Sequence, residues 1–204
     1  ECSAGRYQDM RGELDCIDCA PGKHRTALVS SSSERYACAA CPAGHFQDAS
    51  AQLQCVACGL GKYRLPAASA AGTEGAACAV CELGRYQDAA AQMHCHACAT
   101  GKFRNGASNE NPEHVACTAC PAGHFQPNEA QLSCTACAGG KYRASTGSSS
   151  VEAVACAQCP HGRFQPTPAQ MGRAACKACA IGRFPTAQQT GCADHNTMEH
   201  ICHQ

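Results

Sequence analysis

Cysteine is the residue whose type and spacing could carry chemistry in this sequence. The chain has 204 residues and 21 cysteines, and eighteen of these stand in nine Cys-x-x-Cys pairs. Such pairs can form disulfides, bind zinc or act as redox nucleophiles. The pairs begin at Cys16, Cys38, Cys55, Cys78, Cys95, Cys117, Cys134, Cys156 and Cys176. Which chemistry applies depends on how the pairs follow one another.

The spacing favours a ladder of disulfides, in which the second cysteine of each pair bonds to the first of the next. This scheme closes a series of similar short loops, uses Cys2, and leaves Cys202 over as an unpaired or intermolecular thiol. An alternative joins Cys179 to Cys202 and leaves Cys192 free. The predicted bonds are Cys2–Cys16, Cys19–Cys38, Cys41–Cys55, Cys58–Cys78, Cys81–Cys95, Cys98–Cys117, Cys120–Cys134, Cys137–Cys156, Cys159–Cys176 and Cys179–Cys192.

Zinc is the alternative to disulfides. Cys16, Cys19, Cys38 and Cys41 have the spacing of a zinc ribbon. However, nine pairs cannot be divided into four-ligand sites without a remainder. Cysteine at about a tenth of the residues is also typical of disulfide scaffolds in oxidising compartments. The sequence therefore favours disulfides, and we expect no metal site and no cofactor.

Histidines are the other possible ligands. His94 and His96 flank Cys95, and we expect them to be exposed loop residues. The C-terminal segment is the better metal candidate, with His195, His200, Cys202 and His203. The sequence contains no nucleophile elbow, phosphate loop or metalloprotease motif. Because twenty of the 21 cysteines have a structural assignment, we predict that the protein is not an enzyme.

A repeat of about 40 residues must position these cysteines. Its short half begins with Gly-basic-aromatic-Gln, as in residues 44–47, and its long half with Gly-basic-aromatic-Arg, as in residues 61–64. In the first long half, His24 takes the aromatic position. The predicted boundaries are repeats 1–40, 41–80, 81–119, 120–158 and 159–192, the last with a degenerate second half, and an atypical C-terminal joint or cap at 193–204.

Large apolar residues are too few for a conventional core. Leu, Ile, Val and Phe make up only 21 of the 204 residues. We expect the aromatic of each half and a Leu or Met before the next cysteine to pack on the disulfides. Glutamates near the end of the long halves are expected to pair with arginines, as Arg64–Glu74, Arg104–Glu113 and Arg143–Glu152. The predicted fold is an elongated rod of small disulfide-rich repeats, with short two-stranded ribbons, irregular loops and almost no helix.

Residues 41–81 carry a family resemblance. The run Cys41-Pro42-Ala43-Gly44-His45-Phe46, with the cysteine spacing that follows to Cys81, resembles the ephrin-receptor-like cysteine-rich repeat. It is more distantly similar to the cysteine-rich modules of tumour-necrosis-factor receptors, but lacks their additional inner cysteine pair. The similarity covers residues 1–192. It implies an extracellular module and supports the proposed ladder.

Charge and composition limit the partners. Sixteen basic and sixteen acidic residues give no net charge, so we expect no nucleic-acid partner, and no apolar run could span a bilayer. Ser30–Ser33, Ser145–Ser150 and Thr167 could carry O-linked sugars. Uniform repeats favour an extracellular structural protein, secreted or on the cell surface. Such a protein would be part of a filament, coat or surface appendage, with copies of itself or other extracellular proteins as partners. The alternative is a ligand-binding receptor-like ectodomain.

Overall fold

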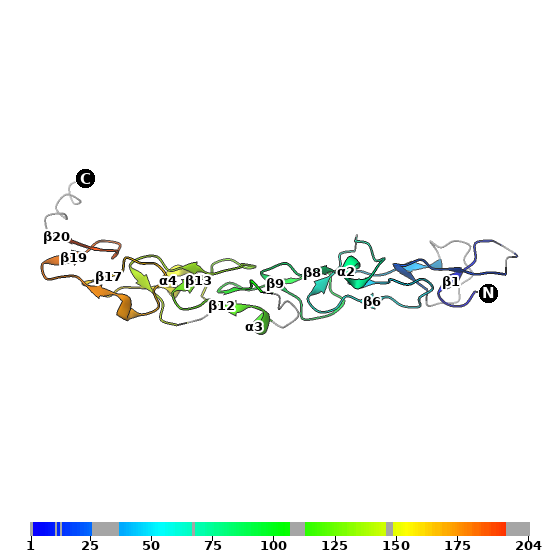
Figure 1. The fold of residues 1–204 in the computed structure, drawn as a ribbon, viewed down its shortest axis with the longest axis horizontal. Helices are drawn as coiled ribbons and strands as arrows, with labels where there is room; N and C mark the ends of the chain where they lie inside the picture. Colours follow the sequence, from blue (N-terminus) through cyan, green and yellow to red (C-terminus); the bar gives the residue numbers. More distant parts are fainter. Residues whose placement is uncertain are drawn as a thin grey trace, which may run out of the picture. The chain divides into compact units, whose positions relative to one another are not determined.

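Short two-stranded ribbons are the building elements of the chain (Figure 1). The structure is a computed structural model that describes residues 2–10, 12, 14–25, 37–66, 68–106, 113–145 and 149–194. These residues form ten two-stranded antiparallel ribbons and a few single helical turns. The predicted class, small disulfide-rich repeats with ribbons and almost no helix, is confirmed.

Both strands of a ribbon can be located in the repeat. The first strand is the basic-aromatic dipeptide after a glycine, and the second is the dipeptide inside a Cys-x-x-Cys pair, except in the last ribbon. The ribbons pair β1 (Arg6–Tyr7) with β2 (Ile17–Asp18), β3 (Lys23–His24) with β4 (Ala39–Ala40), β5 (His45–Phe46) with β6 (Val56–Ala57), β7 (Lys62–Tyr63) with β8 (Ala79–Val80), β9 (Arg85–Tyr86) with β10 (His96–Ala97), β11 (Lys102–Phe103) with β12 (Thr118–Ala119), β13 (His124–Phe125) with β14 (Thr135–Ala136), β15 (Lys141–Tyr142) with β16 (Ala157–Gln158), β17 (Arg163–Phe164) with β18 (Lys177–Ala178), and β19 (Arg183–Pro185) with β20 (Cys192–Asp194).

The long halves end in short helical turns. α2 (Glu74–Ala77), α3 (Glu113–Ala116) and α4 (Glu152–Ala155) each begin at the glutamate that stands four residues before a cysteine. The N–H of Cys78 donates to the carbonyl of Glu74, and that of Cys156 to Glu152. A 3-10 turn, η1 (Arg173–Ala175), stands before Cys176 at the end of the last short half. Each turn leads the chain directly into the second strand of its ribbon.

Ten disulfides close the ribbons. Each joins the second cysteine of one pair to the first of the next, from Cys2–Cys16 to Cys179–Cys192, with Cα–Cα separations of 5.6–5.8 Å. The sulfur atoms take the place of a conventional core. The second cysteine of five pairs is completely buried: Cys19, Cys58, Cys98, Cys120 and Cys137.

The expected apolar contribution to the core is only half correct. Phe46 is buried against Cys58, Ala77 and Cys78, and Tyr7 packs on the cluster around Cys19. The Leu and Met residues, by contrast, are exposed, so the prediction that they cover the disulfides is wrong. They lie on the outside of the short loops, because a glutamine side chain occupies the inside of these loops, as described below. The exposed set is Leu14, Leu53, Met93, Leu132 and Met171.

The chain forms two compact units, and hydrogen bonds link consecutive ribbons inside each. Unit 1 contains Glu1–His96 and Ala107–Ala116, and unit 2 contains Ala97–Gly106 and Cys117–Gln204. In seven of the ribbons, the glycine before the first strand donates its N–H to a carbonyl of the following ribbon. In unit 1 the bonds are Gly5 to Arg25 (3.1 Å), Gly22 to Gln47 (2.8 Å), Gly44 to Arg64 (3.0 Å) and Gly61 to Gln87 (2.8 Å); in unit 2 they are Gly101 to Gln126 (2.8 Å), Gly123 to Arg143 (3.1 Å) and Gly140 to Gln165 (2.6 Å).

Two glycines show why this position tolerates no side chain. Gly5 has a φ of +85° and Gly44 a φ of +75°, values that residues with a Cβ rarely adopt. A Cβ on Gly5 would also collide with the backbone of Ala51, and one on Gly44 with the backbone of Ala91. The glycine thus serves both the turn and the close approach of the next short half.

Candidate functional site

A buried glutamine organises the short halves of the second to fifth repeats. Gln87, with 1% of its surface exposed, donates from Nε2 to the carbonyl of His94 (2.6 Å) and accepts from the N–H of Ala89 through Oε1 (3.1 Å). Gln47 and Gln126 make the same two contacts seven and two residues further along. The amide therefore supplies hydrogen bonds to a loop backbone that forms no regular structure.

A buried arginine has the corresponding place in the long halves. Arg64 is buried, and its guanidinium donates to the carbonyls of Ser69 (3.1 Å), Ala68 (3.0 Å) and Pro42 (2.8 Å). Pro42 belongs to the preceding ribbon, so the side chain also ties two neighbouring ribbons together. Burial lowers the pKa of Arg64 from its usual value. The same position is buried in the other copies at Arg25, Arg104 and Arg143.

The glutamates pair with lysines. Lys62 Nζ lies 2.7 Å from Glu74, and Lys141 Nζ lies 2.9 Å from Glu152. The predicted pairs Arg64–Glu74 and Arg143–Glu152 are therefore wrong, because each arginine is directed inward to backbone carbonyls while the lysine two residues earlier remains at the surface. Both glutamates also accept a backbone N–H, at 2.7 Å from Gly59 and at 2.9 Å from Ala138.

These contacts shift the titration of the two carboxylates. The hydrogen bond from Lys62, followed by that from the Gly59 N–H, lowers the pKa of Glu74. For Glu152 the Ala138 N–H is the larger cause and Lys141 the second, and they lower its pKa too. The charged form of each glutamate is thus the one that holds its helical turn to the start of the same long half.

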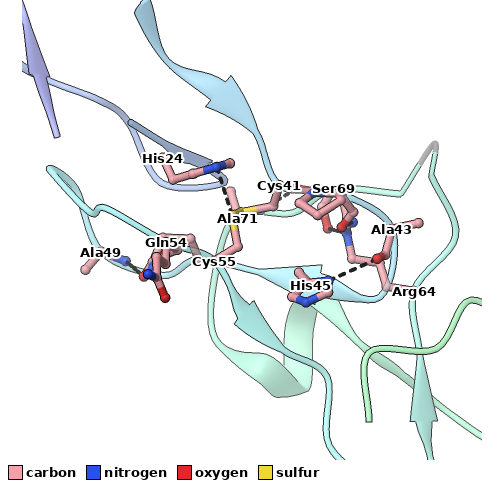
Figure 2. Close-up of a disulfide and its surroundings, with 12 residues drawn as sticks. His24, Cys41, Ala43, His45, Ala49, Gln54, Cys55, Arg64, Ser69 and Ala71 are labelled. Carbon is pink, nitrogen blue, oxygen red and sulfur yellow. Dashed lines mark hydrogen bonds between the residues drawn. A yellow bond between two sulfur atoms is a disulfide. The ribbon is translucent and has the colours of Figure 1, made fainter. Parts of the chain in front are cut away.

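One histidine faces a disulfide. His24 Nδ1 lies 3.3 Å from Cys55 Sγ, and its ring points to the Cys41–Cys55 bond (Figure 2). The three potential ligand atoms of His24, Cys41 and Cys55 lie within 4.8 Å of one another. This cluster differs from the zinc-ribbon set considered from the sequence, because it combines one disulfide with the side chain of the preceding ribbon.

The histidines singled out in the sequence are placed elsewhere. The His96 ring lies against Tyr86, with centroids 5.6 Å apart, and the carbonyl of His94 accepts the Gln87 amide. In the described part of the chain, the group that could hold a metal includes neither of them. The pKa of the Tyr86 ring that His96 contacts is raised, first because the ring is partly buried and then because Glu113 and Asp88 carry negative charge. The C-terminal candidates His195, His200, Cys202 and His203 lie outside the described residues, as do Ser30–Ser33.

Exposed Leu or Met side chains recur near the end of the short halves. Leu14 is 96% exposed, and Leu53, Met93, Leu132 and Met171 are exposed too. The last ribbon adds a different pair, since Ile181 and Phe184 of its first half are exposed, whereas the aromatic residue is at least half-buried in the ribbons before it. These residues are candidates for contact with other molecules.

Comparison with protein families supports the resemblance inferred from the sequence. Residues 29–74 and 107–153 match the profile of the family described as tyrosine-protein kinase ephrin type A/B receptor-like. A search of curated proteins found no match. The chain resembles ephrin-receptor-like cysteine-rich repeats, and this module is not a known enzyme family. Together with the ten disulfides it fits an extracellular location. The described residues contain no helix long and apolar enough to cross a membrane.

Proposed function

We propose that this chain is a non-catalytic structural segment of an extracellular assembly. In this proposal five repeats form a disulfide-stapled rod that acts as a subunit or segment of a filament, coat or surface appendage. The observation that carries it is the recurrence of one exposed Leu or Met in the short half of successive repeats. A surface that repeats along the chain can make the same contact many times, which suits assembly with further copies.

The interior supports a mechanical role. The buried polar side chains Gln87 and Arg64 are occupied by backbone partners. Side chains engaged in this way hold a loop in shape and are not available to a substrate. The short halves and the disulfides thus supply stiffness, and the exposed Leu and Met side chains supply contact.

The composition is compatible with close packing of copies. The net charge is zero, so neighbouring chains do not repel one another through a common sign. Apolar area buried between copies contributes about 25 cal/mol per Å², so small contacts become significant when they are repeated.

A matched pair of variants tests the proposal. We expect Leu53→Ser with Met93→Ser to weaken self-association, measured by light scattering and analytical ultracentrifugation. The control is Ala49→Ser with Ala90→Ser, which changes exposed alanines on the corresponding short loops. Electron microscopy of the native material should then show polymers. A dispersed monomer, unaffected by either pair of substitutions, would contradict the structural role.

A ligand-binding ectodomain is the second candidate, and the last ribbon favours it. Phe184 is 46% exposed and stands near the exposed Ile181, whereas the aromatic residues of the earlier ribbons are at least half-buried. Exposed aromatic residues are common anchors of protein interfaces. In this case Phe184→Ser would abolish binding of a purified partner while Leu53→Ser would not, and the native protein would be a dispersed monomer.

A further inference from the structure

The Cys41–Cys55 disulfide differs from its equivalents in the residue that faces it. His24 is the second residue of β3 and is directed to the disulfide of the following ribbon (Figure 2). The same position in β11 is Phe103, followed by the disulfide Cys120–Cys134. Both disulfides close loops with a sequence separation of 14. The chain therefore contains a matched pair, with an imidazole before one disulfide and a phenyl ring before the other.

We propose that reduction of Cys41–Cys55 by a small thiol turns His24, Cys41 and Cys55 into a binding site for one thiophilic metal ion such as Zn²⁺. The disulfide state keeps this site closed, because both sulfur atoms are engaged in a covalent bond. The reduced state supplies two thiolates and one imidazole, a ligand set that zinc accepts together with water.

The reduction is a two-electron exchange that consumes two external thiols. The first thiolate attacks Cys41 Sγ, so the S–S bond breaks and its electron pair leaves on Cys55 Sγ, the sulfur atom 3.3 Å from His24 Nδ1. The second thiolate attacks the external sulfur of the mixed disulfide and releases Cys41. The external thiols become their own disulfide, and two protons return to the cysteines.

His24 makes thiol–disulfide exchange faster at Cys41–Cys55 than at the disulfides of the other short loops. In the tautomer that is protonated at Nδ1, the ring directs an N–H at Cys55 Sγ and stabilises the negative charge that develops there as the bond breaks. No comparable donor exists on a phenyl ring. Because stabilised thiolates leave faster, we expect Cys41–Cys55 to be reduced roughly tenfold faster than Cys120–Cys134.

The ligand atoms already lie near the positions that a metal requires. With bond lengths of about 2.3 Å to sulfur and 2.0 Å to nitrogen, a tetrahedral zinc holds sulfur and nitrogen roughly 3.5 Å apart. The distance from His24 Nδ1 to Cys55 Sγ is 3.3 Å. Only the two sulfur atoms must separate, and the loop ends that carry them are no longer bonded after reduction. His45, also near, is not part of this set, because its ring is directed to the carbonyl of Ala43 at 3.1 Å (Figure 2).

Swapping the residue types at positions 24 and 103 tests the proposal on the full chain. The native protein is treated with limiting reduced glutathione, alkylated, and mapped by mass spectrometry, which quantifies each disulfide. His24→Phe should slow reduction of Cys41–Cys55 to the rate of Cys120–Cys134, and Phe103→His should accelerate the latter. Intact mass before reduction shows that each variant has formed its disulfides. Equal rates for the two disulfides in the native protein, or rates that the exchange leaves unchanged, would overturn the inference.

Metal binding is measured on the partially reduced protein. We expect one equivalent of Zn²⁺ to bind after reduction of Cys41–Cys55, to protect both cysteines from alkylation, and to be absent from the oxidised protein. His24→Phe, reduced to the same extent with excess thiol, should lose at least roughly tenfold in affinity, as expected on removal of one of three ligands. Failure of the reduced native protein to bind Zn²⁺, or equal binding by His24→Phe, would contradict the metal site.

Discussion

The short and long halves of the repeat solve the same problem with different side chains. Each encloses a loop with almost no regular hydrogen bonding, and each places one buried polar residue after the aromatic of its first strand. The short half uses Gln87, whose side chain bonds only within its own loop, whereas the long half uses Arg64, whose side chain also bonds to the preceding ribbon. The comparison shows that the buried side chain of the short half supports its own loop, and that the buried side chain of the long half also connects two ribbons.

Buried polar side chains thus stabilise the interior of this chain, as apolar side chains do in larger proteins. A hydrogen bond that satisfies a buried group contributes about 1 kcal/mol, but removal of one partner costs about 1–3 kcal/mol. The core of this chain is sensitive to loss of a donor, while its Leu and Met residues lie at the surface. Predictions based on the two halves follow this logic.

The largest effect is expected at the connector. Arg64→Met removes a buried guanidinium that donates to three carbonyls, and should destabilise the loop locally by about 3 kcal/mol. The measurement is amide hydrogen exchange of Gln47, whose N–H donates to the carbonyl of Ala70 in that loop (2.8 Å). The exposed Arg85→Met is the control and should leave this exchange unchanged. Equal protection of Gln47 in both variants would remove the distinction between connector and surface arginines.

A smaller effect is expected in the short half. Gln87→Leu loses one donor and one acceptor, and should cost about 2 kcal/mol, seen as faster exchange of the Ala89 amide. Exchange at the neighbouring long half should not change, because Gln87 makes both side-chain bonds within its own loop. The control is Gln92→Leu, since Gln92 bonds from its side chain only to the exposed carbonyl of Ala90. Faster amide exchange in the long half would show that the Gln87 side chain also supports that half.

The Lys62–Glu74 pair predicts a pH dependence confined to the long half. Because the pKa of Glu74 is lowered in the folded chain, its contribution is complete above the usual carboxyl range and is lost as the pH falls through the folded value. The pair is partly exposed, so the contribution should be about 0.5 kcal/mol or less. The chemical shift of the Gly59 amide reports it, and Glu74→Gln should abolish its titration. A Lys62→Met variant that titrates like the native protein would show that the lysine does not lower the pKa.

The smallest effect concerns an alanine with positive φ. Ala51 has a φ of 58°, and its N–H donates to the carbonyl of Cys19 (2.9 Å). The first repeat has Gly12 at the equivalent position, with a φ of 92°. Ala51→Gly should therefore stabilise this contact by up to about 1 kcal/mol, measured by exchange of the residue 51 amide. Gly12→Ala is the reverse test, and a gain from both substitutions would contradict the backbone explanation.

The sequence predicted the elements better than their interiors. Cysteine spacing and the Gly-basic-aromatic motif indicated the ribbons, because both recur at fixed intervals. The roles of Gln87 and Arg64 were missed, since a polar residue next to an aromatic is usually a surface residue and only the loop backbone around it reveals that it is buried. A signal was present, namely the strict alternation of Gln and Arg after the aromatic residue. The cluster at His24 depends on a contact between different ribbons, so no local pattern could indicate it.

The central claim is that disulfides and buried polar side chains replace an apolar core. Intact mass and non-reduced peptide mapping test it most directly. Ten disulfides lower the mass by about 20 Da relative to the fully reduced chain, two protons for each bond, and the map should link the second cysteine of each pair to the first of the next, as in Cys19–Cys38 and Cys58–Cys78. Free thiols at most of the cysteines, or stoichiometric zinc in the protein as isolated, would contradict the account.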